Sequence, residues 1–293
     1  MSDLHRSRTR DLSYASTAQS RTGRALIRLM ENSTGRLHLI RRARGFEAEL
    51  DSGRNFFDVM VDRYGLALDV VQGSLDLIPR EGPVLFIANH PYGILDGLML
   101  GHMMSRTRGD FRIMAHAVFN NAPDVARHLL PISFDADKAA LALNLATRRA
   151  ALDYLGQGGA VGIFPGGTVS TGRKPFARPM DPCWRGFTAR MIAKSRATVV
   201  PVYFDGHTSR LFQIASHLNQ TLRMGLLIKE FRKRVDTPVR VAIGTPLGRD
   251  VLDPLAGDAK AMMDFLREAT YGLSPEPLVS TDLGFEFEEH YRA

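Results

Sequence analysis

Short apolar runs alternate along the chain with stretches in which apolar residues recur at helical spacing. The apolar runs are bounded by Gly, Pro and other turn residues, as expected for strands buried in a sheet. They lie at residues 66–71, 75–78, 83–88, 111–116, 160–164, 198–204 and 239–244. The stretches with helical spacing lie at residues 55–64, 94–104, 122–130, 137–155, 186–195, 222–234 and 258–271. This alternation predicts an α/β sandwich, with a mostly parallel central sheet flanked by helices.

The first fifty residues differ from the rest of the chain. Residues 1–20 are rich in Ser, Thr and Arg without apolar periodicity, and we expect them to be poorly ordered. Residues 21–50 form an N-terminal amphipathic helical segment, in which leucines recur beside arginines and residues 32–35 interrupt the pattern. An apolar stripe flanked by arginine is typical of a membrane-associating helix. The alternative is an ordinary amphipathic helix packed on the domain.

The remaining chain divides into one large unit and a short tail. We assign residues 51–275 to one folded domain and residues 276–293 to a peripheral C-terminal tail. No apolar run reaches the roughly 18 to 20 residues that a transmembrane helix needs. The polar, Arg-rich start lacks the apolar core of a secretory signal. We therefore expect a protein that stays in the cytoplasm.

Composition and charge restrict the function classes. With 44% hydrophobic and 24% charged residues, the chain has the composition of a folded globular protein. A net charge of +7 and a pI near 9.8 indicate an anionic partner, such as lipid head groups, nucleic acid or a nucleotide-bearing co-substrate. The chain has no nucleic-acid-binding motif and no aromatic-rich strand for base stacking, so we expect no nucleic-acid partner. The single cysteine, Cys183, excludes an internal disulfide and a cysteine-based metal cluster.

The first stretch that carries candidate chemistry follows the apolar run at residues 83–88. It reads Asn89-His-Pro-Tyr-Gly-Ile-Leu-Asp96, and its Pro and Gly end the strand before the next helix begins. His90 and Asp96 therefore lie at a strand-to-helix junction, where the sites of α/β proteins collect. Asp96 could accept from one ring nitrogen and leave the other free as a base. The alternative from these residues alone is a surface histidine followed by a helix-capping aspartate.

The second informative stretch, Pro165-Gly-Gly-Thr-Val-Ser-Thr171, follows the predicted strand at residues 160–164. Its two adjacent glycines, Gly166 and Gly167, permit unusual φ values and let backbone N–H groups approach an anion. Arg173 and Lys174 follow in an exposed loop, where they could meet a phosphate, a carboxylate or a membrane. The alternatives are a simple turn and solvated surface charges.

The stretch Asn-His-Pro-Tyr-Gly-Ile-Leu-Asp-Gly resembles the His/Asp signature of the glycerolipid acyltransferase family. The typical family member has four residues between His and Asp, whereas this chain has five. The longer form is similar to the branch that contains the lyso-ornithine lipid acyltransferases and the haemolysin-like acyltransferases. The resemblance extends from about residue 55 to residue 247 and includes the run Val-Pro-Val-Tyr-Phe at residues 200–204 as the family's fourth block.

This resemblance implies a glycerolipid-acyltransferase-like sandwich over residues 51–275 and the transfer of a fatty acyl group from a thioester to a hydroxyl. His90 would act as the general base on the acceptor hydroxyl, and Asp96 would hold its tautomer. The resemblance implies no metal and no bound cofactor, because the acyl group arrives on acyl-CoA or on an acyl carrier protein (acyl-ACP) as co-substrate. No Ser or Cys lies in a nucleophile motif, so an acyl-enzyme is not required.

The resemblance also implies the residues that bind substrate. The family's third block, which would bind the acceptor and the oxyanion, corresponds to Pro165, Gly166, Gly167, Thr168 and Ser170. Further contacts with the substrate or the thioester carrier are expected at Asn89, Arg173 and Lys174. The family's second, acceptor-side block is loosely patterned and falls on His116, Asn120, Asn121, Arg127 and His128, for each of which we expect a structural or surface role.

Two positions depart from the family's third block. Gly166 stands where Glu is usual, and Val169 stands where Arg is usual. In phosphate-accepting relatives those two side chains help to hold the glycerol phosphate, and Arg is a bidentate phosphate partner. Their loss favours an acceptor without a terminal phosphate, namely a lyso-aminolipid of the lyso-ornithine-lipid type. Two alternatives stay open: a 1-acylglycerol-3-phosphate acyltransferase that makes phosphatidic acid, and a non-catalytic basic peripheral membrane protein.

The partners implied are a lyso-lipid acceptor, an acyl carrier protein or coenzyme A thioester, and an anionic membrane surface. A basic surface would serve the phosphates of coenzyme A or the acidic face of the carrier protein, and also the bilayer. We therefore expect a peripheral protein on the cytoplasmic side of the bacterial inner membrane.

Overall fold

The computed structural model describes residues 13–18, 20–121, 123–133, 135 and 137–287. Its centre is a seven-stranded sheet with the order β1-β7-β6-β2-β5-β3-β4. The strands are β1 (Ala67–Gln72), β2 (Val84–Ala88), β3 (Arg112–His116), β4 (Leu129–Ile132), β5 (Ala160–Ile163), β6 (Thr198–Phe204) and β7 (Pro238–Ile243). Every neighbouring pair runs parallel except β6 with β7. The predicted mostly parallel α/β fold is therefore confirmed.

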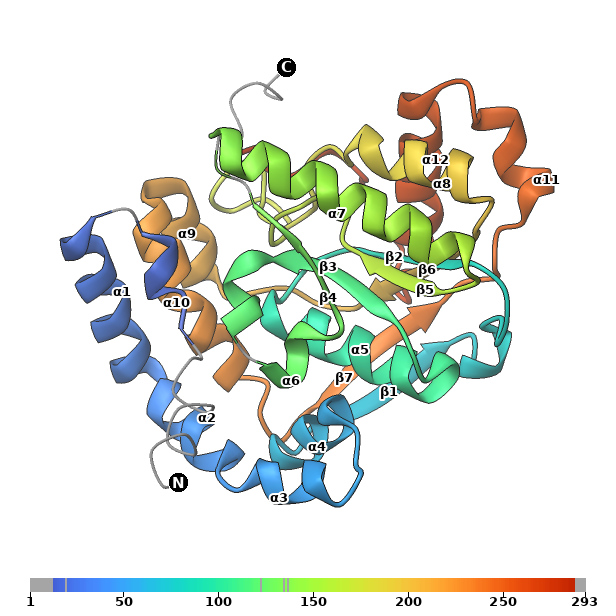
Figure 1. The fold of residues 1–293 in the computed structure, drawn as a ribbon. Coiled ribbons are helices and arrows are strands. Elements are labelled where there is room, and N and C mark those ends of the chain that lie inside the picture. Colours follow the sequence, from blue (N-terminus) through green and yellow to red (C-terminus); the bar gives the residue numbers. More distant parts are fainter. Residues whose placement is uncertain (1–12, 19, 122, 134, 136, 288–293) are drawn as a thin grey trace.

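Helices cover the sheet on both faces (Figure 1). They are α1 (Arg21–Thr34), α2 (Arg36–Ala43), α3 (Phe46–Asp51), α4 (Phe56–Arg63), α5 (Ile94–Arg108), α6 (Pro123–Ala126), α7 (Lys138–Gly156), α8 (Gly186–Ser195), α9 (Arg210–Leu218), α10 (Gln220–Arg232), α11 (Arg249–Leu252) and α12 (Ala259–Tyr271). Residues of α4 and α5 share one apolar core with the sheet, and residues of α7, α8 and α12 share another.

Strand β2 lies in the middle of the sheet and is completely buried. Phe86 belongs to the core that α4 and α5 cover, whereas its neighbours Leu85 and Ile87 belong to the core under α7, α8 and α12. Alternate side chains of a strand point to opposite faces, so a strand covered on both faces must be apolar throughout. The apolar run that predicted this strand therefore also placed the following loop, residues 89–93, at the centre of the sheet's carboxyl edge.

The N-terminal segment, residues 21–50, forms α1, α2 and most of α3, and α1 and α2 meet at Gly35, which has a φ of +147°. Residues 13–18 differ from the expected poor order, because they pack on the protein: the side chain of Tyr14 is buried. The buried carboxyl of Glu31 accepts hydrogen bonds from the Ser13 hydroxyl (2.5 Å) and the Tyr14 N–H (2.6 Å). Residues 1–12 of the predicted disordered stretch lie outside the described residues.

Two predicted elements are wrong. The predicted strand at residues 75–78 is a 3-10 turn (Leu75–Leu77), because the Ser74 hydroxyl accepts from the N–H of Asp76 and caps the turn locally. The predicted helix at residues 122–130 is replaced by the short helix α6 followed by strand β4, which contains Pro131. β4 is an edge strand, where a residue without an N–H is tolerated.

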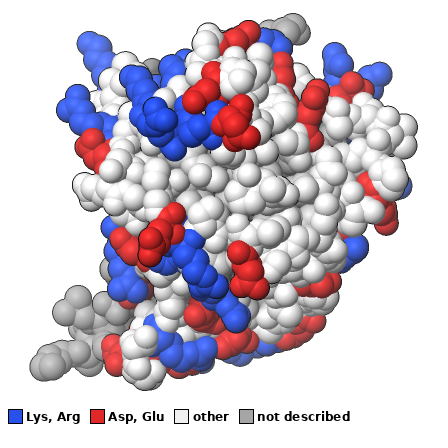
Figure 2. Space-filling view, turned by 90° about the vertical axis from the view of Figure 1, so that its right-hand side faces the viewer, with Lys and Arg blue, Asp and Glu red and all other residues white. Residues whose placement is uncertain are grey.

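Charges of both signs are mixed on the face around α11, which Figure 2 shows. Lys, Arg, Asp and Glu side chains gather in its upper and lower parts, and a broad band between them carries neither sign. Among the residues coloured there, no continuous basic patch is present. None of the helices in the described part of the chain is long and apolar enough to cross a bilayer.

Candidate active site

The loop after β2 is tied to the neighbouring strand by Asn89. Its side-chain amide donates to the carbonyl of Phe204 (2.9 Å), and its carbonyl oxygen accepts from the Phe204 N–H (2.7 Å). Asn89 is 3% exposed, so both halves of the amide are used inside the protein. The structure thus places Asn89 as a clamp that fixes where the loop leaves the sheet, rather than as a substrate contact.

The next residue, His90, faces the carboxyl of Asp96 across the loop. Nδ1 of His90 lies 2.9 Å from Oδ2 of Asp96. This is a hydrogen-bond distance, but the ring is not aligned for a straight bond, and Nδ1 makes no hydrogen bond of good geometry among the described residues. The imidazole stacks on Phe164, with ring centroids 4.2 Å apart. The structure therefore brings His90 and Asp96 together across the folded loop between them.

Asp96 is held from behind by the backbone of that loop. Its Oδ2 accepts from the N–H groups of Tyr92 (2.8 Å) and Gly93 (3.0 Å) in a capping box at the start of α5. Gly93 has a φ of +81°, which favours glycine there. The carboxyl is fully buried, and burial raises its pKa above 3.8 against the opposing effects of His90 and the two N–H groups. The carboxyl that faces His90 therefore also caps the start of α5.

The glycine-rich loop packs directly against the His90 loop. The N–H of Ser170 donates to the carbonyl of His90 (2.8 Å). Gly167, with a φ of +69°, donates its N–H to the Phe164 carbonyl (2.9 Å) in a tight turn. That N–H is therefore not free for an oxyanion, which corrects the expectation for Gly167. The N–H of Gly166 has no acceptor among the described residues and remains the candidate donor.

Pro165, Thr168 and the two basic residues lie at different depths. The carbonyl of buried Pro165 accepts from the Arg185 N–H (3.0 Å), so this residue anchors the loop to the start of α8. The Thr168 hydroxyl is half-buried and accepts from Arg223 (3.0 Å). Arg173 and Lys174 are exposed in the excursion between Thr171 and Met180, and no contact joins them to His90 or Asp96.

Asp181 is a central residue that sequence patterns did not indicate. This fully buried side chain accepts from the Ser170 hydroxyl (2.5 Å) and the His90 N–H (3.2 Å) through Oδ1, and from the indole N–H of Trp184 (2.9 Å) through Oδ2. A Cβ at Gly166 would come within 3.2 Å of Asp181. One carboxyl therefore joins both loops, and its only sequence signal was a lone Asp beside Pro and Trp.

We expect Asp181→Asn to destabilise the protein by about 2 kcal/mol. The amide NH₂ group would replace a carboxyl oxygen that accepts a hydrogen bond, so a buried donor would lose its acceptor. Any activity that depends on the His90–Asp96 pair should fall too, since the same bonds place His90 and Ser170. Urea unfolding measures the first effect. Asp282→Asn, on an exposed side chain, is the matched control. Equal stability of the two variants would contradict the assigned role of Asp181.

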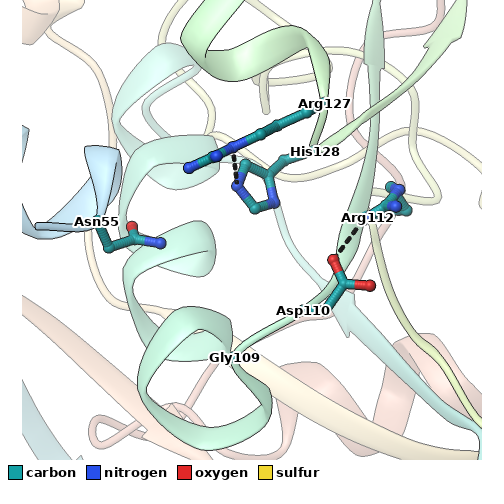
Figure 3. Close-up of a pocket in the computed structure, with 6 residues that line it drawn as sticks. All are labelled: Asn55, Gly109, Asp110, Arg112, Arg127 and His128. Atoms are coloured by element: carbon teal, nitrogen blue, oxygen red, sulfur yellow. Dashed lines mark hydrogen bonds and ion pairs between the residues drawn. The ribbon is translucent and has the colours of Figure 1, made fainter. Parts of the chain in front are cut away.

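A pocket with a volume of about 350 Å³ lies at the opposite edge of the sheet, just before β3 and β4 begin. Figure 3 shows Arg127 lying across His128, with Asn55 on the other side of the pocket. Arg127 Nε donates to His128 Nε2 (3.1 Å), and the other ring nitrogen lies 3.3 Å from the Phe111 carbonyl. Burial lowers the pKa of His128, which fits a neutral ring with its proton on Nδ1.

That position separates Arg127 and His128 from the His90 loop, because the carboxyl and amino ends of parallel strands lie at opposite edges. This position fits the structural role expected for these two residues. His116 lies at the carboxyl end of β3, where its Nδ1 accepts from the Val118 N–H (3.1 Å) and burial lowers its pKa. Asn120 and Asn121 lie in a 3-10 turn after β3.

Comparisons with known proteins found a matching family model, two similar sequences and a similar structure. A family model described as Acyltransferase matches residues 38–277. The chain is 22% identical over 231 residues to the lyso-glycine lipid O-acyltransferases of Phocaeicola vulgatus and of Bacteroides thetaiotaomicron. These alignments cover 76% of this chain and 77% and 79% of the two relatives. The 1-acyl-sn-glycerophosphate (LPA) acyltransferase PlsC from Thermotoga maritima is similar in structure, with a TM-score of 0.47 and 15% identity over 88% of this chain and 83% of PlsC.

Proposed function

The chain belongs to the acyltransferase family, and from that premise we propose that it is a lysolipid O-acyltransferase whose acceptor is a lyso-aminolipid. The family assignment makes it an enzyme that transfers acyl groups. The names of the two relatives, lyso-glycine lipid O-acyltransferases, support an acceptor with an amino-acid head group. The lyso-ornithine lipid expected from the sequence belongs to the same chemical class. The observation that carries the proposal is the buried carboxyl of Asp96 held 2.9 Å from Nδ1 of a partly exposed His90.

In the proposed reaction His90 is the general base. With Nδ1 turned toward Asp96, Nε2 remains to take the proton of the acceptor hydroxyl as its oxygen bonds to the thioester carbon. When the C–S bond breaks, the proton passes from Nε2 to the departing sulfur. The products are an ester and a free thiol, and His90 is neutral again. Asp96 stabilises the imidazolium that exists between the two transfers.

The carbonyl oxygen of the thioester becomes negatively charged between these steps and needs hydrogen-bond donors. The free N–H of Gly166 is the proposed donor, and a donor of this kind contributes about 3 to 4 kcal/mol to the transition state. The acyl donor is proposed to be acyl-CoA or acyl-ACP, used as a co-substrate.

Purified protein tests the proposal directly. It should form an ester product from a thioester donor and an N-acylated amino-acid lipid that carries a free hydroxyl. Lysophosphatidic acid serves as the competing acceptor, and both acyl-CoA and acyl-ACP are supplied. Preference for lysophosphatidic acid would favour phosphatidic acid synthesis instead. Absence of transfer to either acceptor by folded protein would leave the non-catalytic alternative.

The site must reach a lipid, and α1 with α2 is the proposed membrane contact. Leu26, Leu29 and Leu37 are 41%, 66% and 54% exposed, beside the exposed arginines Arg21 and Arg28. The opposite side of α1 packs on α10, through Ile27 among others. In Figure 1 these helices lie at the far side of the molecule from α11. We propose peripheral binding through this surface to anionic lipid, on the cytoplasmic side of the bacterial inner membrane.

Leu29→Glu should weaken binding to anionic vesicles by about tenfold, because it removes an apolar side chain from the interface and adds a like charge. Co-sedimentation with vesicles measures the effect. Leu145→Glu on α7, where the leucine is 54% exposed, is the matched control. An equal loss in both variants would argue that α1 has no special part in binding.

A further inference from the structure

Helix α10 carries an arginine that points into the protein. This residue, Arg223, is only 2% exposed. The helix packs between α1 and α9. The rings of Phe212 and Phe287 lie 5.0 and 4.2 Å from the guanidinium carbon. Arg223 is thus a buried cation beside the glycine-rich loop.

Its hydrogen-bond partners are all neutral. Nη1 donates to the hydroxyls of Thr171 (2.7 Å) and Ser216 (2.8 Å). Nη2 donates to the Thr168 hydroxyl (3.0 Å) and the Val169 carbonyl (2.8 Å). Within the described residues, no carboxyl group pairs with this guanidinium. A buried charge without a counter-charge is costly, even when its N–H groups are satisfied.

Burial lowers the pKa of Arg223 to about 9, and the guanidinium therefore remains charged at neutral pH. A negative group that arrives near the loop would offset part of the desolvation cost. Because three of the four acceptors of Arg223 belong to residues 168–171, the loop itself is where this charge is felt most strongly.

Thr168 is the member of this set that can reach a ligand. It is half-buried, and its hydroxyl oxygen accepts from Arg223. Its O–H proton has no acceptor among the described residues, so it is left to donate outward. Two residues further on, Ser170 meets the backbone of His90. A donor polarised by a buried cation is therefore fixed on the loop that touches the catalytic pair.

We propose that Thr168 binds the carboxylate of the acceptor's head group and that Arg223 is the positioning residue that orients and polarises the Thr168 hydroxyl. The inference rests on the proposed function, because an amino-acid lipid attached through its amine keeps a free carboxylate. The acceptor would be held by its head group at Thr168 while its hydroxyl lies at His90. The carboxylate replaces the counter-charge that the protein does not supply.

The test compares two acceptors that differ only at the head-group carboxyl, the lyso-aminolipid free acid, which is charged, and its methyl ester, which is neutral. Wild type should prefer the free acid. Thr168→Val, which keeps shape and removes the donor, should raise the KM for the free acid about tenfold or more, with kcat little changed. The KM for the ester should stay unchanged, and Thr168→Ser should retain the preference.

Arg223→Met should abolish the preference for the free acid, with Arg232→Met on the exposed side of α10 as the control. Arg223→Met removes buried hydrogen bonds and could fail to fold for that reason alone. In that case the result for Thr168→Val decides whether the inference stands. A variant of Thr168 that loses the same factor on both acceptors overturns the inference while the proposed function stands. A wild-type protein that acylates neither acceptor overturns the proposed function and this inference with it.

Discussion

Replacing His90 by alanine is expected to lower the rate of acyl transfer by about 10⁴-fold, at the upper end of what general-base catalysis contributes. In the proposed reaction the imidazole of His90 takes the proton of the acceptor hydroxyl. Its side chain is 18% exposed and its main packing contact is the stack on Phe164, so the variant should fold. Product formation under saturating thioester measures the effect, and circular dichroism checks the fold.

His38→Ala on α2 serves as the control, because it removes a histidine outside the loop that carries the catalytic pair. It should retain wild-type turnover. Near-wild-type turnover of His90→Ala would remove His90 from the mechanism, and a different base would have to be found.

Asp96→Asn is expected to lower the rate by about 10²-fold, less than loss of the base itself. The amide oxygen can still accept from the N–H groups of Tyr92 and Gly93, so the helix start should survive. The negative charge that stabilises the imidazolium is lost. A rate equal to that of wild type would show that the two side chains are not coupled in the reaction.

The stability of the protein should also depend on pH through Asp96, and the burial of its carboxyl sets the direction of this dependence. The pKa of Asp96 is raised above 3.8 in the folded protein, so the folded state holds this proton more tightly than the unfolded chain. The stability contributed by Asp96 therefore falls as pH rises from about 3.8 through the raised pKa. We therefore expect the stability of Asp96→Asn relative to wild type to rise as pH increases above about 3.8, measured by urea unfolding at a series of pH values. A constant difference would contradict the raised pKa.

The elements that were predicted correctly are those with long or uniform patterns. Strand β2 is apolar at every position because it is covered on both faces, and α7 repeats its apolar positions over several turns. The failures are short segments. Ser74 capped a turn where alternation favoured a strand, and Pro131 ended a predicted helix although it lies inside an edge strand. In each case a single local bond or the place in the sheet outweighed propensity.

The candidate site was predictable to the extent that it lies in contiguous stretches. His90, Asp96 and the glycine-rich loop each follow a strand and carry recognisable chemistry. Asn89 and Gly167 were assigned contacts with substrate, yet their polar groups are used by Phe204 and Phe164. Asp181 was missed, because its partners come from two other loops and no spacing rule connects them.

By itself, the order of residues determined the sandwich and placed a histidine and a carboxyl in the junction that follows a buried strand. These follow from local periodicity and from the rule that parallel strands end at one edge. Only the tertiary structure decided which polar groups remain free: it engaged the N–H of Gly167, left that of Gly166 open, buried Asp181 between two loops and turned Arg223 inward behind Thr168. The physical reason is that a hydrogen-bonding group is available only when no neighbour satisfies it, and those neighbours come from distant parts of the chain.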